Sequence, residues 1–173
     1  MTAPTKLEAL QALKAILATV TVPAGSSALA GVYIWPQDYA TAPQILATPA
    51  IMLTRAAGLG ATPGRIARKA GGLVWHKWHA FINVYVALGQ IARMDQAAAD
   101  SEAAASAWEL AITQVLWANQ TLQGKAHAIG EPNGDLFDLA TYVEGHLPWG
   151  NSQYWGLSFR LPIVQTYTET MRS

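Results

Sequence analysis

The sequence has no cysteine and, for its 173 residues, few charged side chains. Without cysteine it can form no disulfide, no thiolate nucleophile, no cysteine-ligated zinc site and no iron–sulfur cluster. Lys, Arg, Asp and Glu make up 13% of the chain, which is about half the share usual in globular proteins. So few charges leave little solvated surface, and we expect other subunits, a partner or a ligand to cover part of the apolar surface.

The sequence also lacks long apolar runs and the common catalytic motifs. No stretch of about 18 uncharged apolar residues is present, so we expect no membrane span. Lys6, Glu8 and Lys14 interrupt any signal-peptide core near the start. The patterns G-x-x-x-x-G-K-S/T, G-x-S-x-G and H-E-x-x-H do not occur. We therefore expect a soluble intracellular protein that is not an enzyme and has no cofactor and no resident metal.

Helical periodicity predicts two helices, at residues 6–19 and 95–123. Thr5 and Glu8 have the spacing of a capping box at the start of the first helix, and Gly124 is a typical stop for the second. Apolar and alternating runs predict strands at 31–36, 49–54, 73–88, 126–129, 136–144 and 154–168, with turns at 132–135 and 148–151. This order is typical of an α+β protein, one domain over residues 1–173, with both helices on one face of a mainly antiparallel sheet.

Residues 73–88 show the clearest strand pattern. Their even-numbered positions are mainly apolar, and their odd-numbered positions are mainly polar or aromatic. The stretch is longer than the usual strand of about 5–6 residues, so we expect a bent strand or one that protrudes from its sheet. In the last strand Pro162 cannot donate a ladder hydrogen bond, which predicts an edge position or a bulge there.

A Gly-rich segment at residues 56–72 separates the second and third predicted strands. It contains five Gly, one Pro and the cations Arg65, Arg68 and Lys69. This composition predicts a long mobile basic loop, and loops of this length inside a compact domain are commonly functional. We expect Arg65, Arg68 and Lys69 to contact a partner or DNA.

The zero formal net charge conceals an uneven distribution of charge along the chain. No acidic residue lies between Asp38 and Asp95, whereas the stretch from Asp95 to Glu144 has eight acidic residues and one basic residue. Three interpretations are open. The charges can interleave on the folded surface, complementary patches can join identical subunits head to tail in a ring, or the basic loop can bind nucleic acid.

The four histidines do not form an evident site. His76 and His79 are three positions apart on a predicted strand, so they point to opposite faces and are not expected to share a metal. His127 and His146 lie on separate predicted strands that can meet in space. They leave open a small hydrolase built on either histidine.

Seven tryptophans are an unusual feature of a chain this small. Trp78, Trp108 and Trp155 fall on predicted core faces. The other four, Trp35, Trp75, Trp117 and Trp149, fall at strand ends, on the opposite face or in a turn. Tryptophan is favoured at the centres of protein interfaces, and its ring can also stack on sugars. We predict Trp75, Trp117 and Trp149 to be interface anchors.

The order of these elements resembles the tail terminator proteins of long-tailed bacteriophages, which are small α+β proteins that close the tail tube. The features that carry the resemblance are the amphipathic helix at 6–19, the Pro-bounded strands at 32–35 and 50–53, the long strand at 75–86, the Ala-rich helix ending near Leu122, and the terminal run at 154–164. They cover nearly the whole chain. The family has no catalytic residues.

The resemblance implies a hexameric ring in the tail or neck of the virion, assembled in the host cytoplasm. Such a ring sits on the last ring of tail-tube subunits, stops polymerisation and joins the tail to the head connector, with genomic DNA passing through its lumen. Because residues 56–72 make the chain longer than the family leads one to expect, a head-completion or adaptor protein of the neck is an alternative. A Trp-rich module that binds carbohydrate or another small molecule is an alternative of a different class.

Overall fold

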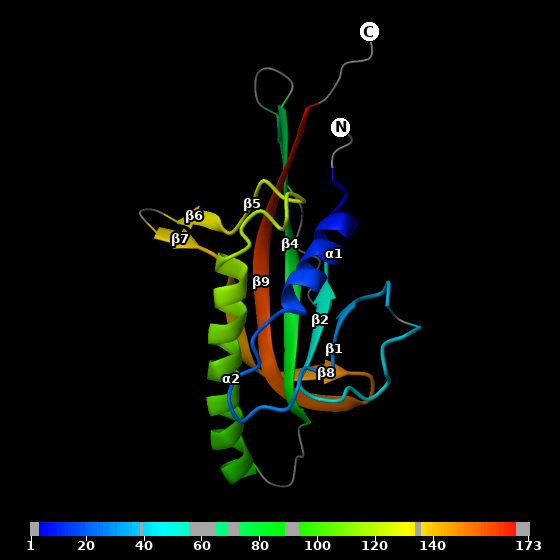
Figure 1. Cartoon of the computed structure of the whole chain (residues 1–173), viewed down its shortest axis with the longest axis vertical. Coiled ribbons are helices and arrows are strands. Elements are labelled where there is room, and N and C mark those ends of the chain that lie inside the picture. Colours follow the sequence, from blue (N-terminus) through cyan, green and yellow to red (C-terminus); the bar gives the residue numbers. More distant parts are fainter. Residues whose placement is uncertain are drawn as a thin grey trace.

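A computed structural model describes residues 4–38, 40–55, 65–68, 73–88, 94–133 and 136–168. Within these ranges, helices α1 (Lys6–Leu17) and α2 (Met94–Trp117) lie on one face of a seven-stranded sheet (Figure 1). The sheet contains β1 (Gly31–Ile34), β2 (Ala50–Thr54), β3 (Arg65–Arg68), β4 (Leu73–Leu88), β5 (Ala128–Ile129), β8 (Thr141–Trp149) and β9 (Ser152–Thr168), and β6 (Glu131–Asn133) forms a separate hairpin with β7 (Leu136–Asp138). The predicted α+β class is confirmed. The sheet is mostly antiparallel, with β1 and β2 as a parallel pair.

The long strands β4 and β9 form the centre of the sheet. They pair antiparallel from Leu73 opposite Thr168 to Leu88 opposite Tyr154, with one shift of register between Tyr85 and Ala87. The predicted strand at 73–88 is therefore confirmed. In Figure 1 the β4–β9 ribbon extends beyond α1, as its length led us to expect.

The main core lies between this sheet and the two helices. The even-numbered apolar residues of β4 and the odd-numbered ones of β9 pack against the helices, so the predicted alternation of both strands is confirmed. Trp78 and Trp108 are buried there, and Trp155 is half-buried at the edge of the core. Burial of a large apolar side chain is worth about 1.5–3 kcal/mol, which holds the helices on this face.

The segment that follows β1 covers the other face of the sheet at one end. Leu46, Met52, Tyr85 and Tyr154 form a second buried cluster there. The Leu46 N–H donates to Tyr154 Oη at 2.9 Å, which anchors the segment over the strands. This second layer was not predicted, because the loop sequence between β1 and β2 has no periodicity.

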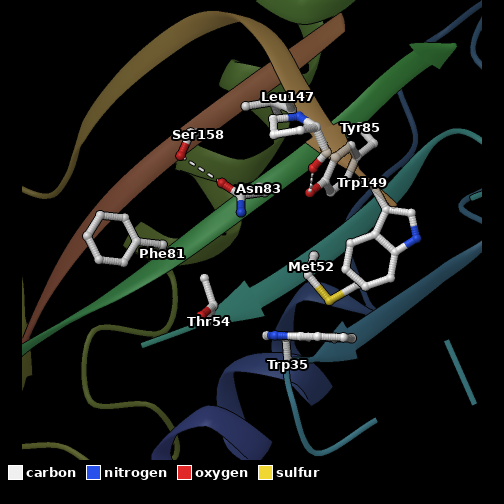
Figure 2. Close-up of a pocket in the computed structure, with 10 residues that line it drawn as sticks. Trp35, Met52, Thr54, Phe81, Asn83, Tyr85, Leu147, Trp149 and Ser158 are labelled. Atoms are coloured by element: carbon white, nitrogen blue, oxygen red, sulfur yellow. Dashed lines mark hydrogen bonds between the residues drawn. The ribbon is translucent and has the colours of Figure 1, made fainter. Parts of the chain in front are cut away.

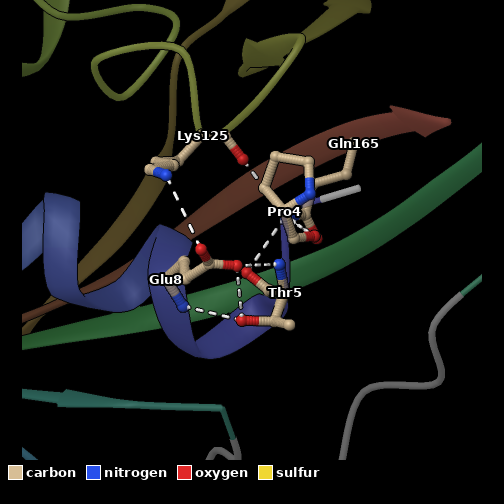
Figure 3. Close-up of polar contacts among 5 residues, drawn as sticks. All are labelled: Pro4, Thr5, Glu8, Lys125 and Gln165. Carbon is tan, nitrogen blue, oxygen red and sulfur yellow. Dashed lines mark hydrogen bonds and ion pairs between the residues drawn. The ribbon is translucent and has the colours of Figure 1, made fainter. Parts of the chain in front are cut away.

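A buried glutamine ties the ends of both helices to the sheet (Figure 3). Gln165 Oε1 accepts the Trp78 Nε1–H at 2.9 Å. Its Nε2 donates to the carbonyls of Pro4 at 3.0 Å, Thr5 at 3.3 Å and Lys125 at 3.1 Å. Gln165 therefore joins the start of α1, the turn after α2 and two central strands.

The predicted capping box at the start of α1 is confirmed. The Glu8 N–H donates to Thr5 Oγ1 at 3.1 Å, and the Thr5 N–H donates to a Glu8 carboxylate oxygen at 2.6 Å. The bonds from Thr5 lower the pKa of Glu8, with a further contribution from nearby Lys125. The helix ends at Leu17, two residues before its predicted end.

The predicted basic loop is wrong in part. Arg65–Arg68 forms β3, which pairs antiparallel with the first residues of β4, from Arg65 opposite Lys77 to Arg68 opposite Val74. On the side away from β9, β2 pairs with β4 only from Phe81 to Tyr85. The earlier part of β4 would be an open edge on that side, and β3 pairs with it. The rest of the predicted loop, residues 56–64 and 69–72 with Lys69, lies outside the described residues.

The predicted boundaries after residue 117 also need correction. The second helix ends at Trp117 instead of 123, because Leu122, Gln123 and Gly124 have positive φ angles that no right-handed helix allows. The single strand predicted at 136–144 is two strands, since β7 folds back on β6 and β8 joins β9. No helix in the described part of the chain is long and apolar enough to cross a bilayer.

Pro162 lies where one side of β9 has no partner strand, which is the local edge that was predicted there. It sits in β9, opposite His79 of β4, in the middle of the sheet. On the other side of β9, β8 pairs up to Arg160, and β5 begins to pair at Ile163. Pro162 therefore falls in the gap between the ends of β8 and β5. No partner strand lies there to accept a hydrogen bond from the N–H that proline lacks.

Candidate interaction surface

Six large apolar side chains are exposed on three neighbouring elements of the molecule, with Val143 on the face of β8 that is turned away from the helices. They come from the outer side of α2, from β7 and from the start of β8, and each is 41% to 72% exposed: Leu110, Trp117, Leu136, Phe137, Tyr142 and Val143. We call this set the α2–β8 surface. Contiguous exposed apolar side chains are typical of protein interaction sites.

Two contacts join α2 to β7 and to β8. The rings of Trp117 and Phe137 lie 5.8 Å apart between centroids, which places the end of α2 beside β7. Tyr142 Oη donates to Glu109 Oε2 at 2.8 Å, which places the start of β8 beside the middle of α2. That hydrogen bond, more than burial, raises the pKa of Tyr142 above its usual value.

The strand β8 is also an edge of the sheet. Among the described strands, it pairs with β9 alone, over the nine residues from Thr141 to Trp149. Its first four residues are exposed. An edge strand presents unpaired N–H and C=O groups that can pair with another chain. The α2–β8 surface thus combines exposed apolar side chains with an open strand edge.

The uneven charge of the sequence is only partly neutralised in the fold. Lys77 of the basic stretch forms an ion pair with Glu131 of the acidic stretch. Asp138 and Glu144, however, lie on β7 and β8, while Arg65 lies on β3. Since β3 flanks β4, and β8 flanks β9 on its far side, Arg65 and Glu144 lie on strands at opposite sides of the β4–β9 pair, while Asp138 belongs to the separate β6–β7 hairpin. Some charges of the two stretches are therefore paired, as in Lys77 with Glu131, and others, such as Arg65 and Glu144, lie on separate strands.

The predicted interface anchors do not gather in one place. Trp117 lies on the α2–β8 surface and is 45% exposed. Trp75 is half-buried, with its ring 4.9 Å from that of His127. Trp149 is half-buried too, and its ring contacts Trp35 at 5.1 Å on the far face of the sheet. Of the three, Trp117 alone therefore lies on this surface.

The predicted basic residues lie beside one of these anchors. Arg65 and Arg68 bound β3, and Ala67 between them is in register with Trp75. The structure therefore brings the basic strand next to Trp75, at the opposite edge of the sheet from β8. Lys69 lies outside the described residues.

The histidines do not come together. His146 is paired with Trp155 of β9, while Ala128, the neighbour of His127, is paired with Val164. Nine strand residues separate these positions, which corresponds to about 30 Å. Within the described residues, no three His, Asp or Glu side chains are close enough to hold a metal ion.

Five residues of the α2–β8 surface, all except Trp117, were not predicted as functional. Leu136 with Phe137, and Tyr142 with Val143, are adjacent apolar pairs in the sequence. Neighbouring residues of a strand point to opposite faces. Where the core covers only one face of the strand, one residue of each apolar pair must therefore stay exposed. Such doublets are the pattern from which this surface could have been found.

Comparison with known proteins adds no assignment to this geometry. No protein-family model matches the chain, and no curated protein matches it in sequence.

Proposed function

We propose that the protein is a structural subunit that assembles into a ring, as tail terminators of long-tailed phages do. In this role it caps the tail tube, stops tube polymerisation and joins the tail to the head connector. The resemblance in the order of elements suggests this class of protein. The α2–β8 surface supplies the observation that carries the proposal.

The α2–β8 surface suits association with another protein chain. A monomer that exposed Val143, Leu136 and Trp117 to water would leave apolar area hydrated at a cost of about 25 cal/mol per Å². A flat open edge on β8 invites further strand pairing. A second chain that covers this surface removes the apolar area from water and pairs the open edge of β8.

A closed ring needs two different surfaces on each subunit, because each subunit meets its neighbours head to tail. The acidic residues of β8 and of the β6–β7 hairpin beyond one side of β9, and the basic strand β3 on the far side of β4, are two surfaces of this kind. Opposite charges on the two surfaces favour head-to-tail association over contact of like surfaces. The tail-tube protein, the head connector and DNA in the lumen are the further partners of this proposal.

The experiment that tests self-assembly is light scattering after size exclusion, across a concentration series. We expect a particle with a mass near six times 18.5 kDa. Val143→Lys, which places a charge on the open edge, should shift the particle to monomer. Leu7→Lys is the matched control, because Leu7 is an exposed apolar residue on α1, away from this surface.

The capping role needs a separate measurement with tail-tube protein. Added during tube polymerisation, the chain should shorten the tubes and bind one tube end in electron micrographs. Binding to isolated connectors with no effect on tubes would assign it to head completion. A monomer that binds neither tubes nor connectors would contradict the proposal.

A further inference from the structure

The face of the sheet opposite the helices contains an aromatic hollow of about 360 Å³. Its lining consists of four aromatic residues, three aliphatic residues and three small polar ones: Trp35, Phe81, Tyr85, Trp149, Met52, Leu147, Pro148, Thr54, Asn83 and Ser158. A second hollow of about 870 Å³ adjoins it and shares Trp35, Pro148 and Trp149. We call the two hollows together the tryptophan groove.

The floor of the groove is built on three paired strands. Met52 of β2, Asn83 of β4 and Ser158 of β9 lie side by side in register. Figure 2 shows Phe81 on one side of this row and Trp149 on the other. Because the floor consists of central strands, it is formed before any ligand arrives, as in most small-molecule sites.

A polar group faces into the hollow. Ser158 Oγ donates to Asn83 Oδ1 at 2.7 Å, which sets the orientation of the amide. Figure 2 shows the amide nitrogen, Nδ2, directed into the space between Phe81, Thr54 and Met52. In the described part of the chain, no hydrogen-bond partner of that nitrogen is found. Asn83 therefore offers donors toward the hollow, beside the Ser158 hydroxyl.

The groove carries no charge. None of the residues that line either hollow has an acidic or basic side chain. Burial raises the pKa of Tyr85 to about 12, so its hydroxyl stays neutral at physiological pH. A phosphate or carboxylate ligand would find no cation among the lining residues, and its desolvation would be costly. The lining therefore matches an uncharged ligand.

We propose that the tryptophan groove binds a neutral sugar ring of an oligosaccharide. A pyranose presents an apolar C–H face to aromatic rings, and its hydroxyls both donate and accept hydrogen bonds. The aromatic walls and the Asn83–Ser158 pair supply both kinds of contact, and the adjoining hollow has room for further rings. The lining of the groove shares no residue with the α2–β8 surface, although Val143 lies on the same face of β8 as Leu147 and Trp149.

An extended proline-rich peptide fits the groove less well. Aromatic grooves that bind such peptides need donors at the rim for the peptide carbonyls. Here the Trp149 Nε1–H already donates to the Pro43 carbonyl at 2.9 Å, and the Tyr85 hydroxyl donates to the Pro148 carbonyl at 3.4 Å. The Asn83 donor lies on the floor, where a compact ring reaches it.

The test follows the indole N–H signals of Trp35 and Trp149 by NMR, assigned with Trp35→Phe and Trp149→Phe. The probes are maltotriose, cellotriose and chitotriose, each titrated to about 10 mM, with glucose 6-phosphate as the charged probe and a decaproline peptide. At least one neutral trisaccharide should shift both signals saturably, and glucose 6-phosphate should not.

Asn83→Leu should weaken that binding at least about tenfold, because the ligand hydroxyl loses its donor. Asn133→Ala, which removes an asparagine from the β6–β7 hairpin, should bind as the wild type does. If Asn83→Leu does not fold, Ser158→Ala takes its place, since it removes the hydroxyl that orients the Asn83 amide and leaves the amide itself in the groove. The absence of a saturable shift with any trisaccharide, saturation by decaproline alone, or unchanged binding in the folded groove variant would overturn the proposal.

Discussion

Gln165 is the residue on which most distant segments of the chain converge. Its side chain is buried on β9, and its amide satisfies one indole N–H and three backbone carbonyls. A buried polar atom that loses its partner costs roughly 1–3 kcal/mol. The contribution of Gln165 to stability therefore lies in the groups that it satisfies, and only secondarily in its own burial.

Replacement of this amide by an alkyl side chain of similar size should be strongly destabilising. We expect Gln165→Leu to lower the free energy of unfolding by about 2–4 kcal/mol, because Trp78 Nε1 and the carbonyls of Pro4 and Lys125 lose their partner, whereas the Thr5 carbonyl keeps the Ala9 N–H. Urea denaturation measures the change. Gln153→Leu, at an exposed position of the same strand, should stay within about 0.5 kcal/mol of the wild type. A loss for Gln165→Leu no greater than for this control would contradict the assigned role.

His79 makes stability depend on pH. Arg160 Nη2 lies 3.2 Å from His79 Nε2, and a guanidinium can only donate, so Nε2 accepts and the ring is neutral. Burial, and then the charges of Arg160 and Lys77, lower the pKa of His79 below its usual value of 6.5. Between the lowered pKa and 6.5, the unfolded chain binds more protons than the folded one. Stability is therefore complete above this window and falls as the pH drops through it.

The His79→Gln variant should lose less stability on acidification than the wild type does. We expect a smaller fall in the free energy of unfolding between about pH 7.5 and about pH 5, measured by urea denaturation at both values. The fall should not vanish, because burial and then Lys6 also lower the pKa of His76. Gln153→Leu, at an exposed position of β9 without a titratable group, should keep the wild-type pH dependence. An equal fall in His79→Gln and the wild type would show that His79 is not the group concerned.

At the scale of elements, the pairing of β4 with β9 depends on one close approach. Gly156 lies opposite Tyr85, next to the shift of register in β4. A Cβ atom at Gly156 would lie 2.0 Å from the Val84 carbonyl oxygen, a distance that no real contact permits. Only glycine lets the two long strands come this close at the bend.

Gly156→Ala should therefore force the two central strands apart. We expect a loss of at least about 2 kcal/mol in the free energy of unfolding, measured by chemical denaturation. Gly25→Ala is a useful comparison, since Gly25 has φ +83° but a Cβ atom added there would meet nothing within 4 Å. That variant should lose only about 1–2 kcal/mol from backbone strain. A smaller loss for Gly156→Ala than for Gly25→Ala would contradict the close approach.

At the scale of the whole molecule, the proposed ring has a basic segment, Arg65, Arg68 and Lys69, that we predict to contact the tail tube, the head connector or DNA. Changing Arg65, Arg68 and Lys69 to Gln should abolish attachment to tail tubes or connectors, because the complementary charge is lost. Circular dichroism should stay unchanged. The measurement is co-sedimentation with each partner at low and high salt.

The control for this prediction removes the same amount of charge elsewhere. Lys6, Arg55 and Lys125 lie outside β3, and changing them to Gln should leave attachment intact. If the variant of the basic segment attaches as well as the wild type, the assignment of Arg65, Arg68 and Lys69 is wrong.

Local features of the sequence were enough to predict several parts of the fold. The capping pattern at Thr5 and Glu8 placed the start of α1 correctly, because a cap depends on residues three apart. Alternation along β4 and β9 identified the residues that face the helices, because the period of a strand is a local property. The α+β class follows from the order of these segments.

The sequence alone determined which residues share a face of a strand or helix, and so most of the main core. The tertiary structure alone decided what covers the second face and the edges. The tryptophan groove needs Trp35, Asn83 and Trp149 from three strands or their ends, and the α2–β8 surface needs Trp117 beside Phe137. Such sites depend on strand order and register between residues far apart in the chain. No local period encodes that order, because it is set by the packing of all the elements together.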